Sequence, residues 1–341
     1  MQTQSSQPNR LNFPPVARYA WFVLIYNLGV ILWGAYVRAS GSGAGCGSHW
    51  PSCNGEIIPR APALETLIEF AHRLSSGGAL LLVFGLFFWT HRSYPKEHRV
   101  RLGATLSLLF ILTEALVGAG LVLFEWVAED ASAGRAISIA VHLVNTFLLL
   151  AALTLTAWWA SGGRGVDVRG NRALSWILGV GLFGVVLLGA TGAITALGDT
   201  LFPAGTLAEG FQQDLSPTAH FLIRLRVWHP VVAILVGFYV LFIAGFLGFT
   251  TEDRWIKRMA VILMALFVVQ FGAGLLNLVF LAPVWMQIVH LFLADLVWIA
   301  LVLLAVTSLS QDVEKSTVEE QVAEVDYRGS DSGEDWKPSK I

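Results

Sequence analysis

The sequence has few charged residues: Asp, Glu, Lys and Arg make up 13% of its 341 residues, whereas hydrophobic residues make up 55%. Soluble domains carry about twice that share of charge, because polar side chains must cover the surface around their core. This composition argues against a soluble fold, and it predicts that most of the chain is surrounded by lipid.

Cysteine is also scarce, with only Cys46 and Cys53 in the whole chain. They fall in a loop that we expect on the oxidising, outer side of a membrane, where they can form a short disulfide loop. A metal site would need further ligands, and only His49 is near, so a disulfide is the favoured interpretation. The spacing fits a structural disulfide and a redox-active one equally well.

Long apolar runs dominate the rest of the chain. Each run reaches the length of about 20 residues that crosses a bilayer. Eight such runs in succession leave almost no polar sequence to coat a soluble core. The predicted spans cover residues 17–37, 67–90, 102–125, 136–160, 174–197, 221–250, 256–281 and 284–309.

The basic residues predict the orientation of these spans. Arg and Lys gather before the first span and in every second connection, whereas the other connections are acidic or neutral. Because basic loops stay in the cytoplasm, we expect a multi-pass protein of the cell membrane with both termini inside. The first span lacks a signal-peptide cleavage pattern, so it counts as a span. The tail is rich in Glu, Asp, Ser and Lys, which predicts disorder.

The spans form an internal repeat. Glu114 to Phe124 in the third span aligns with Gln270 to Phe280 in the seventh, sharing Gly-Ala-Gly. Val-His-Leu occurs in both the fourth and eighth spans, and Gly-Ala in the first and fifth. We therefore predict an all-α membrane protein with eight transmembrane helices in two repeat-related four-helix bundles. The predicted segments are a cytoplasmic N-terminal segment (1–16), an N-terminal bundle (17–160), a cytoplasmic linker (161–173), a C-terminal bundle (174–309) and a disordered cytoplasmic tail (310–341).

Four histidines lie inside spans near the same, outer end of their helices. They are His72, His142, His229 and His290, on spans two, four, six and eight. A lone histidine in a span often only bonds a neighbouring helix, but four at repeat-related places favour a shared function. One pair per bundle suits haem iron, which takes an axial ligand on each face, better than zinc, which takes three or four clustered ligands.

Charged neighbours distinguish the two halves. Glu69, His72 and Arg73 share one helical face in the second span, whereas Arg226 and Pro230 flank His229 in the sixth. A carboxylate beside a haem can move protons, and an arginine can pair with haem propionates. The alternative is that Glu69 only pairs with Arg73.

His220 is a second histidine near the start of the sixth span. It lies nine residues before His229, about 900° of helix rotation away, so the two cannot ligate one iron. The repeat alignment favours His229.

The outer loop carries a more specific signature. Gly-Ser-Gly-Ala-Gly-Cys46-Gly-x-x-Trp-Pro-x-Cys53-x-Gly, followed by Ile-Glu69-x-x-His72-Arg73, resembles the haem A synthase family of the cysteine-containing bacterial type. The resemblance extends over the whole pattern of spans. One departure is Pro230, where family members often have arginine; Arg224 or Arg226 is the expected replacement for contact with the propionates.

The resemblance implies an oxidoreductase that oxidises the C8 methyl of haem O to a formyl group, giving haem A for terminal oxidase assembly. His72 and His142, with Arg73, would hold the substrate haem beside an essential, catalytic Glu69. His229 and His290 would ligate a resident haem b as cofactor. Cys46 and Cys53 would form a disulfide close to the substrate site.

The expected partners are haem O from a haem O synthase, an electron acceptor in the membrane, membrane lipids and a second copy of the chain, and no nucleic acid. A dihaem b-type membrane cytochrome for electron transfer is the main alternative, since it explains four histidines but not a carboxylate in one half only. A transporter should show broken helices and a site at the membrane midplane, so it fits least well.

Overall fold

The computed structural model describes the backbone of residues 14–331 and the side chains of residues 14–310. This part of the chain is helical, and eight of its helical segments are long and apolar enough to cross a membrane. The predicted multi-pass membrane fold is therefore confirmed. The spans are α1 (Pro15–Ala39), α2 (Leu64–Ser93), α3 (Arg99–Leu123), α4 (Ala133–Ala160), α5 (Arg172–Leu201), α7 and α8 together (Phe221–Arg226 and Trp228–Thr250), α9 (Arg254–Val279) and α10 (Val284–Asp331).

Polar side chains set where several spans begin. Ser132 accepts a hydrogen bond from the Arg135 backbone N–H at the start of α4. Asn171 caps α5 in the same way, and Asp253 caps α9. Such caps satisfy backbone donors that have no partner inside the helix, so each span starts at the polar residue that precedes its apolar run.

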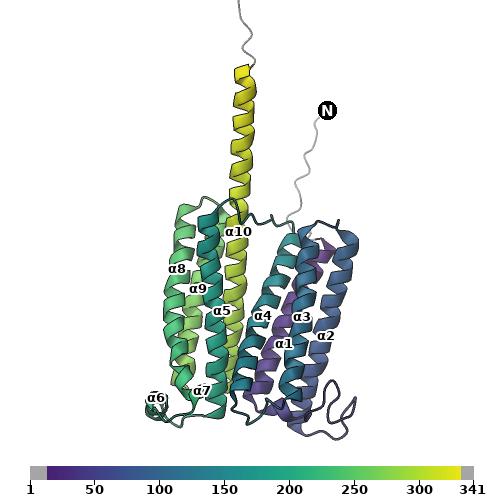
Figure 1. The fold of residues 1–341 in the computed structure, drawn as a ribbon, viewed down its shortest axis with the longest axis vertical. Coiled ribbons are helices and arrows are strands. Elements are labelled where there is room, and N and C mark those ends of the chain that lie inside the picture. Colours follow the sequence, from purple (N-terminus) through teal and green to yellow (C-terminus); the bar gives the residue numbers. More distant parts are fainter. Residues whose placement is uncertain (1–13, 332–341) are drawn as a thin grey trace, which may run out of the picture.

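The spans form two four-helix groups that lie side by side (Figure 1). In the first, α1 packs on α2, α2 on α3, α3 on α4, and α4 returns to α1. In the second, α5, α8, α9 and α10 close a ring in the same way. Helices α4 and α10 pack against each other and join the groups, which we call the N-terminal and C-terminal bundles.

Aromatic packing fills this junction between the bundles. Phe147 of α4 stacks on Trp298 of α10 with ring centroids 5.2 Å apart, and the indole N–H donates to the Phe147 carbonyl. A Cβ at Gly189 of α5 would lie 2.7 Å from the Phe147 ring. Only glycine lets α5 approach so closely, so the junction is a packed interface.

The loop with the two cysteines lies at the end of the bundles where α2, α4, α7 and α10 begin, which we call the cysteine-loop end. Two short helices lie in loops at this end, η1 (Ser42–Ala44) and α6 (Leu207–Leu215). The start of α1 and the far end of α10 lie at the opposite end (Figure 1).

The structure differs from the sequence prediction at the tail. We expected disorder from residue 310, but α10 continues as one helix to Asp331. Extending an existing helix avoids the cost of nucleation, and the tail sequence contains good helix formers such as Glu, Ala and Lys. Residues 332–341 lie outside the described part of the chain.

Candidate functional site

His229 of α8 and His290 of α10 face each other inside the C-terminal bundle. Their ring centroids are 6.3 Å apart and the ring planes are nearly perpendicular, at 87°. A histidine nitrogen lies about 2 Å from a bound transition metal, so two rings on opposite sides of one iron have centroids about 6 Å apart. The pair therefore fits the axial ligands of one haem.

The N-terminal bundle holds the corresponding pair, His72 on α2 and His142 on α4. Both lie in one ring of helices, on its second and fourth members, as His229 and His290 do in theirs. The Nδ1 atom of His72 is buried, and it has no hydrogen-bond partner among the described residues. A buried polar atom of this kind is costly unless a ligand or a second group compensates it, so this pair also fits a bound group.

Each of the four histidine rings lies against a glycine of the preceding span. The pairs are Gly34 with His72, Gly118 with His142, Gly192 with His229, and Gly274 with His290. A Cβ would come within 2.9 Å of His72 and within 3.0 Å of His229 and of His290, and 3.8 Å from His142. Gly34, Gly192 and Gly274 make room for their rings, whereas Gly118 lies at ordinary packing distance from His142.

The contacts also correct the register of the repeat. The sequence alignment matched Gly34 with Gly189, but Gly192 makes the equivalent histidine contact in α5. Gly189 instead faces Phe147 at the bundle junction. The shift is three residues, close to one helical turn, and Gly-Ala occurs at both places, so apolar pattern alone did not separate them.

Glu69 connects α2 to the cysteine loop. The carboxylate is 3% exposed, and its Oε2 accepts a hydrogen bond of 2.8 Å from the Cys46 backbone N–H. Its Oε1 forms an ion pair with Arg73, one turn further along α2. The pairing that the sequence allowed as an alternative is therefore present, together with a direct contact to the loop.

The cysteine loop is fixed on the start of α2. Cys46 and Cys53 form a disulfide with Cα atoms 4.4 Å apart, and both are buried. Arg73 donates to the carbonyls of His49 and Ser52 in this loop, at 2.6 Å each. Arg73 was expected to contact a haem propionate; its guanidinium is engaged with protein partners here.

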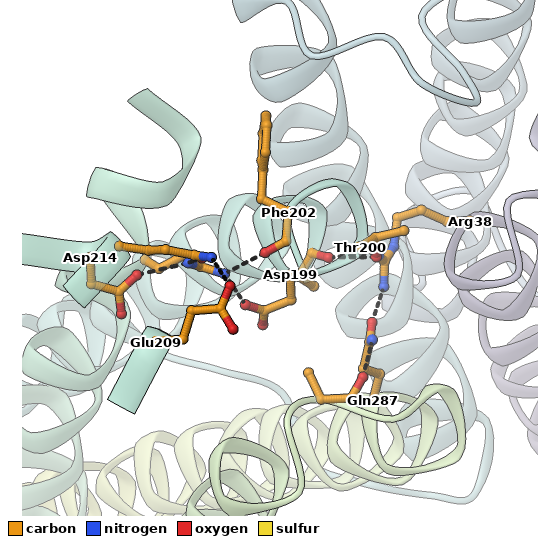
Figure 2. A network of polar contacts seen from close by, with 11 residues as sticks. Arg38, Asp199, Thr200, Phe202, Glu209, Asp214 and Gln287 are labelled. Atoms are coloured by element: carbon orange, nitrogen blue, oxygen red, sulfur yellow. Dashed lines mark hydrogen bonds and ion pairs between the residues drawn. The ribbon is translucent and has the colours of Figure 1, made fainter. Parts of the chain in front are cut away.

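The same holds for Arg226, the other arginine expected at propionates. The Arg226 guanidinium lies between two carboxylates, Asp199 of α5 at 3.1 Å and Asp214 of α6 at 2.9 Å. Both aspartates are labelled in Figure 2. It also donates to the Phe202 carbonyl. Arg226 thus attaches α6 to the end of α5, whereas Arg224 points to the surface. His220 caps the start of α7 and lies beside the Phe202 ring.

Arg38 bridges the two bundles at this end (Figure 2). From the last turn of α1 it donates to the Ala196 carbonyl and to the Thr200 hydroxyl of α5, at 2.8 and 2.7 Å. Its other amino group donates to Gln287 Oε1 of α10 at 2.8 Å. One side chain therefore holds the N-terminal bundle to two helices of the C-terminal bundle.

Comparison with known proteins adds the family. The family COX15-CtaA, described as cytochrome oxidase assembly protein, matches residues 17–302. The chain belongs to this haem A synthase family. The match includes both histidine pairs and at least part of each of the eight spans.

Individual relatives carry two different names. Proteins from two strains of Thermus thermophilus named protoheme IX farnesyltransferase are 51% and 50% identical over 322 residues, 94% of this chain and 53% of theirs. The chain thus spans about half the length of these relatives. A protein from an Exiguobacterium species named heme A synthase is 29% identical over 259 residues, 76% of this chain and 82% of its own.

Sequence reasoning missed the contacts of two charged residues in the N-terminal bundle, Arg38 and Glu114. The Oε1 atom of Glu114 in α3 lies 3.0 Å from the Nδ1 atom of His142. Glu114 entered the sequence analysis only as the first residue of the repeat alignment. A carboxylate inside a span was the available signal, because such groups are rare without a functional partner.

Proposed function

We propose that this protein is a haem A synthase that oxidises the C8 methyl of haem O to a formyl group. Membership of the family and the relatives named heme A synthase support the proposal. The product, haem A, would serve terminal oxidase assembly, in keeping with the description of the family.

In this proposal His72 and His142 hold the substrate haem O in the N-terminal bundle. Glu69 takes up protons that the methyl group loses, because a carboxylate in a water-poor site can act as a general base. Arg73 positions Glu69 and the cysteine loop. The disulfide of Cys46 and Cys53 keeps this loop against the start of α2, close to His72 in sequence and space.

His229 and His290 hold haem b in the C-terminal bundle. When bound there, haem b supplies one-electron redox chemistry. His229 Nδ1 lies 3.3 Å from the Thr191 hydroxyl, and a second hydrogen bond of this kind orients a ligating imidazole. Gly192 and Gly274 leave room for the two rings, because a Cβ at either position would lie 3.0 Å from the ring.

One observation carries the enzyme proposal: only the N-terminal bundle joins a carboxylate on its first histidine helix to a disulfide loop. Glu69 joins the histidine helix of the N-terminal bundle to Cys46, and the C-terminal bundle contains no cysteine. A dihaem cytochrome needs two axial pairs but has no use for this asymmetry. The asymmetry is explained if haem O is oxidised in the N-terminal bundle and haem b stores electrons in the C-terminal bundle.

The proposal includes partners and an orientation. Two relatives are named protoheme IX farnesyltransferase and match this chain over half their length, which supports a haem O synthase as the source of substrate. Converting the methyl group to a formyl group with the oxygen of water would remove four electrons and four protons, so an acceptor in the membrane must receive the electrons. Basic residues in the loops at the end opposite the cysteine loop support cytoplasmic termini in the cell membrane.

The test is a Glu69→Gln variant, expressed in cells that make haem O and analysed for haem A by mass spectrometry. Glutamine keeps the shape and can still accept the Cys46 hydrogen bond, but it cannot take up a proton. We expect haem A to disappear while haem b stays bound. The matched control is Glu65→Gln, one turn earlier and exposed, which should retain haem A formation. Normal haem A yield from Glu69→Gln would overturn the assigned chemistry; two haem b and no haem A in the unaltered protein would favour the cytochrome.

A further inference from the structure

Glu114 is a second carboxylate of the N-terminal bundle, and the mechanism above does not use it. It lies on α3 with its Oε1 atom 3.0 Å from Nδ1 of His142 on α4. This is an ion-pair distance; among the described residues, the buried Nδ1 makes no hydrogen bond. The ring nitrogen that remains, Nε2, is the one that faces Gly118 of α3.

Two neighbours of His142 hold the carboxylate in place. The Thr146 hydroxyl donates to Glu114 Oε1 at 2.5 Å, and the Asn145 amide donates to Oε2 at 2.5 Å. Asn145 is itself fixed, because its amide also donates to the Phe110 carbonyl and its Oδ1 accepts from the Thr113 hydroxyl at 2.6 Å. We call Glu114, Asn145, Thr146 and Thr113 the Glu114 cluster. These hydrogen bonds hold the Glu114 carboxylate in one position. The side chain therefore loses little further conformational freedom when it contacts His142.

The C-terminal bundle lacks this cluster at every corresponding position. The repeat aligns Glu114 with Gln270, Asn145 with Leu293, Thr146 with Ala294 and Thr113 with Val269. Gln270 still approaches the histidine of its bundle, with its Nε2 atom 3.3 Å from His290 Nε2. The polar contact is therefore kept in both bundles, but only the N-terminal one carries a charge and the residues that support it.

We propose that Glu114 is a positioning residue for His142, which orients the ring with Nε2 toward the substrate haem and strengthens it as an iron ligand. This inference rests on the proposed function, because it takes His142 as a ligand of that haem. A carboxylate that accepts from the far nitrogen of a ligating histidine fixes its tautomer and raises its basicity. Gln270 carries no charge, so it raises the basicity of His290 less than Glu114 raises that of His142.

The consequence is a difference between the two haem sites. A more basic imidazole stabilises ferric over ferrous iron, so the haem at His142 should have the lower midpoint potential. The Glu114 cluster thus gives the two haem sites different midpoint potentials, although both sites use histidine ligands. The device is independent of Glu69, which contacts the cysteine loop and Arg73.

The experiment is a redox titration of the purified full-length protein, loaded with haem O and haem b, comparing Glu114→Gln with the unaltered chain. Removing a group behind a metal ligand typically weakens binding about 10- to 100-fold. A tenfold loss in the preference for ferric iron raises the midpoint potential of a one-electron couple by about 59 mV. We expect a rise of at least that size at the haem held by His142, and an unchanged potential at the other.

Two further variants distinguish a specific effect of Glu114 on the potential from a general effect of misfolding. Thr146→Ala, which installs the residue of the other bundle, loosens the carboxylate without removing it and should move the same potential upward by a smaller amount. Gln270→Met removes the corresponding contact from the C-terminal bundle and should leave the haem at His142 unaffected.

The outcomes separate this inference from the proposed function. His142→Ala assigns the N-terminal haem by the signal that it removes. If the N-terminal haem is detected and its midpoint potential is unchanged in both Glu114→Gln and Thr146→Ala, the role of Glu114 is refuted and the haem assignment stands. If His142→Ala removes no haem signal, the ligand assignment fails, and this inference fails with it.

Discussion

Replacing Gly274 by alanine should weaken binding of haem b, because the added methyl group would push against the ring of His290. The Cβ would lie 3.0 Å from the ring Cε1 atom, whereas carbon atoms pack at about 3.5–4.0 Å. The ring must therefore move by several tenths of an ångström. Overpacking of this kind costs about 1–3 kcal/mol, which corresponds to roughly 5- to 150-fold weaker haem binding.

Gly272→Ala is a matched control on the same helix. A Cβ at Gly272 meets no other atom within 4 Å. Both variants gain the same intrinsic helix propensity, about 1 kcal/mol, so the difference between them isolates the contact with His290. Haem b content after purification, and its rate of transfer to an excess of apomyoglobin, are the measurements. Equal haem retention in the two variants would refute the argument that glycine makes room for the ring.

Two further substitutions test other parts of the site. His229→Ala should remove haem b while His220→Ala retains it, since only His229 faces His290; the haem spectrum of each purified variant is the measurement, and haem b loss from His220→Ala alone would contradict the assignment. Arg38→Leu should lower the free energy of unfolding by about 1.5–3 kcal/mol, because it removes charged hydrogen bonds between the bundles. Thermal unfolding in detergent measures this, and the exposed Arg224→Leu should unfold like the unaltered protein.

The spans were predictable from the sequence because hydropathy over some 20 residues decides membrane insertion with little help from tertiary structure. The histidine pair at 229 and 290 was predictable for a related reason. The second and fourth helices of a four-helix ring lie diagonally opposite, so histidines at the same depth on them can face each other across its interior. Helix geometry excluded binding of one iron by both His220 and His229, and the repeat alignment favoured His229; the structure places His220 at a helix cap.

The contacts made by Glu114, Arg73 and Arg226 were not predictable in the same way. Such contacts depend on which face a helix turns toward its neighbours. A span that is apolar on all faces does not reveal that rotation. Charge predicted propionates as partners of the arginines, and in the structure nearby carboxylates and loop carbonyls also bind them. The helix α6 was missed because nine residues in a polar connection give too short a pattern.

The central claim is that each bundle holds one haem between its two histidines, and the most direct measurement is the number and mass of haems released from the purified protein. The account predicts one haem b per chain together with one haem O or haem A. It also predicts that His72→Ala lowers only the haem O or haem A fraction and that His290→Ala lowers only haem b. A single haem per chain, or loss of the same haem from both variants, would contradict it.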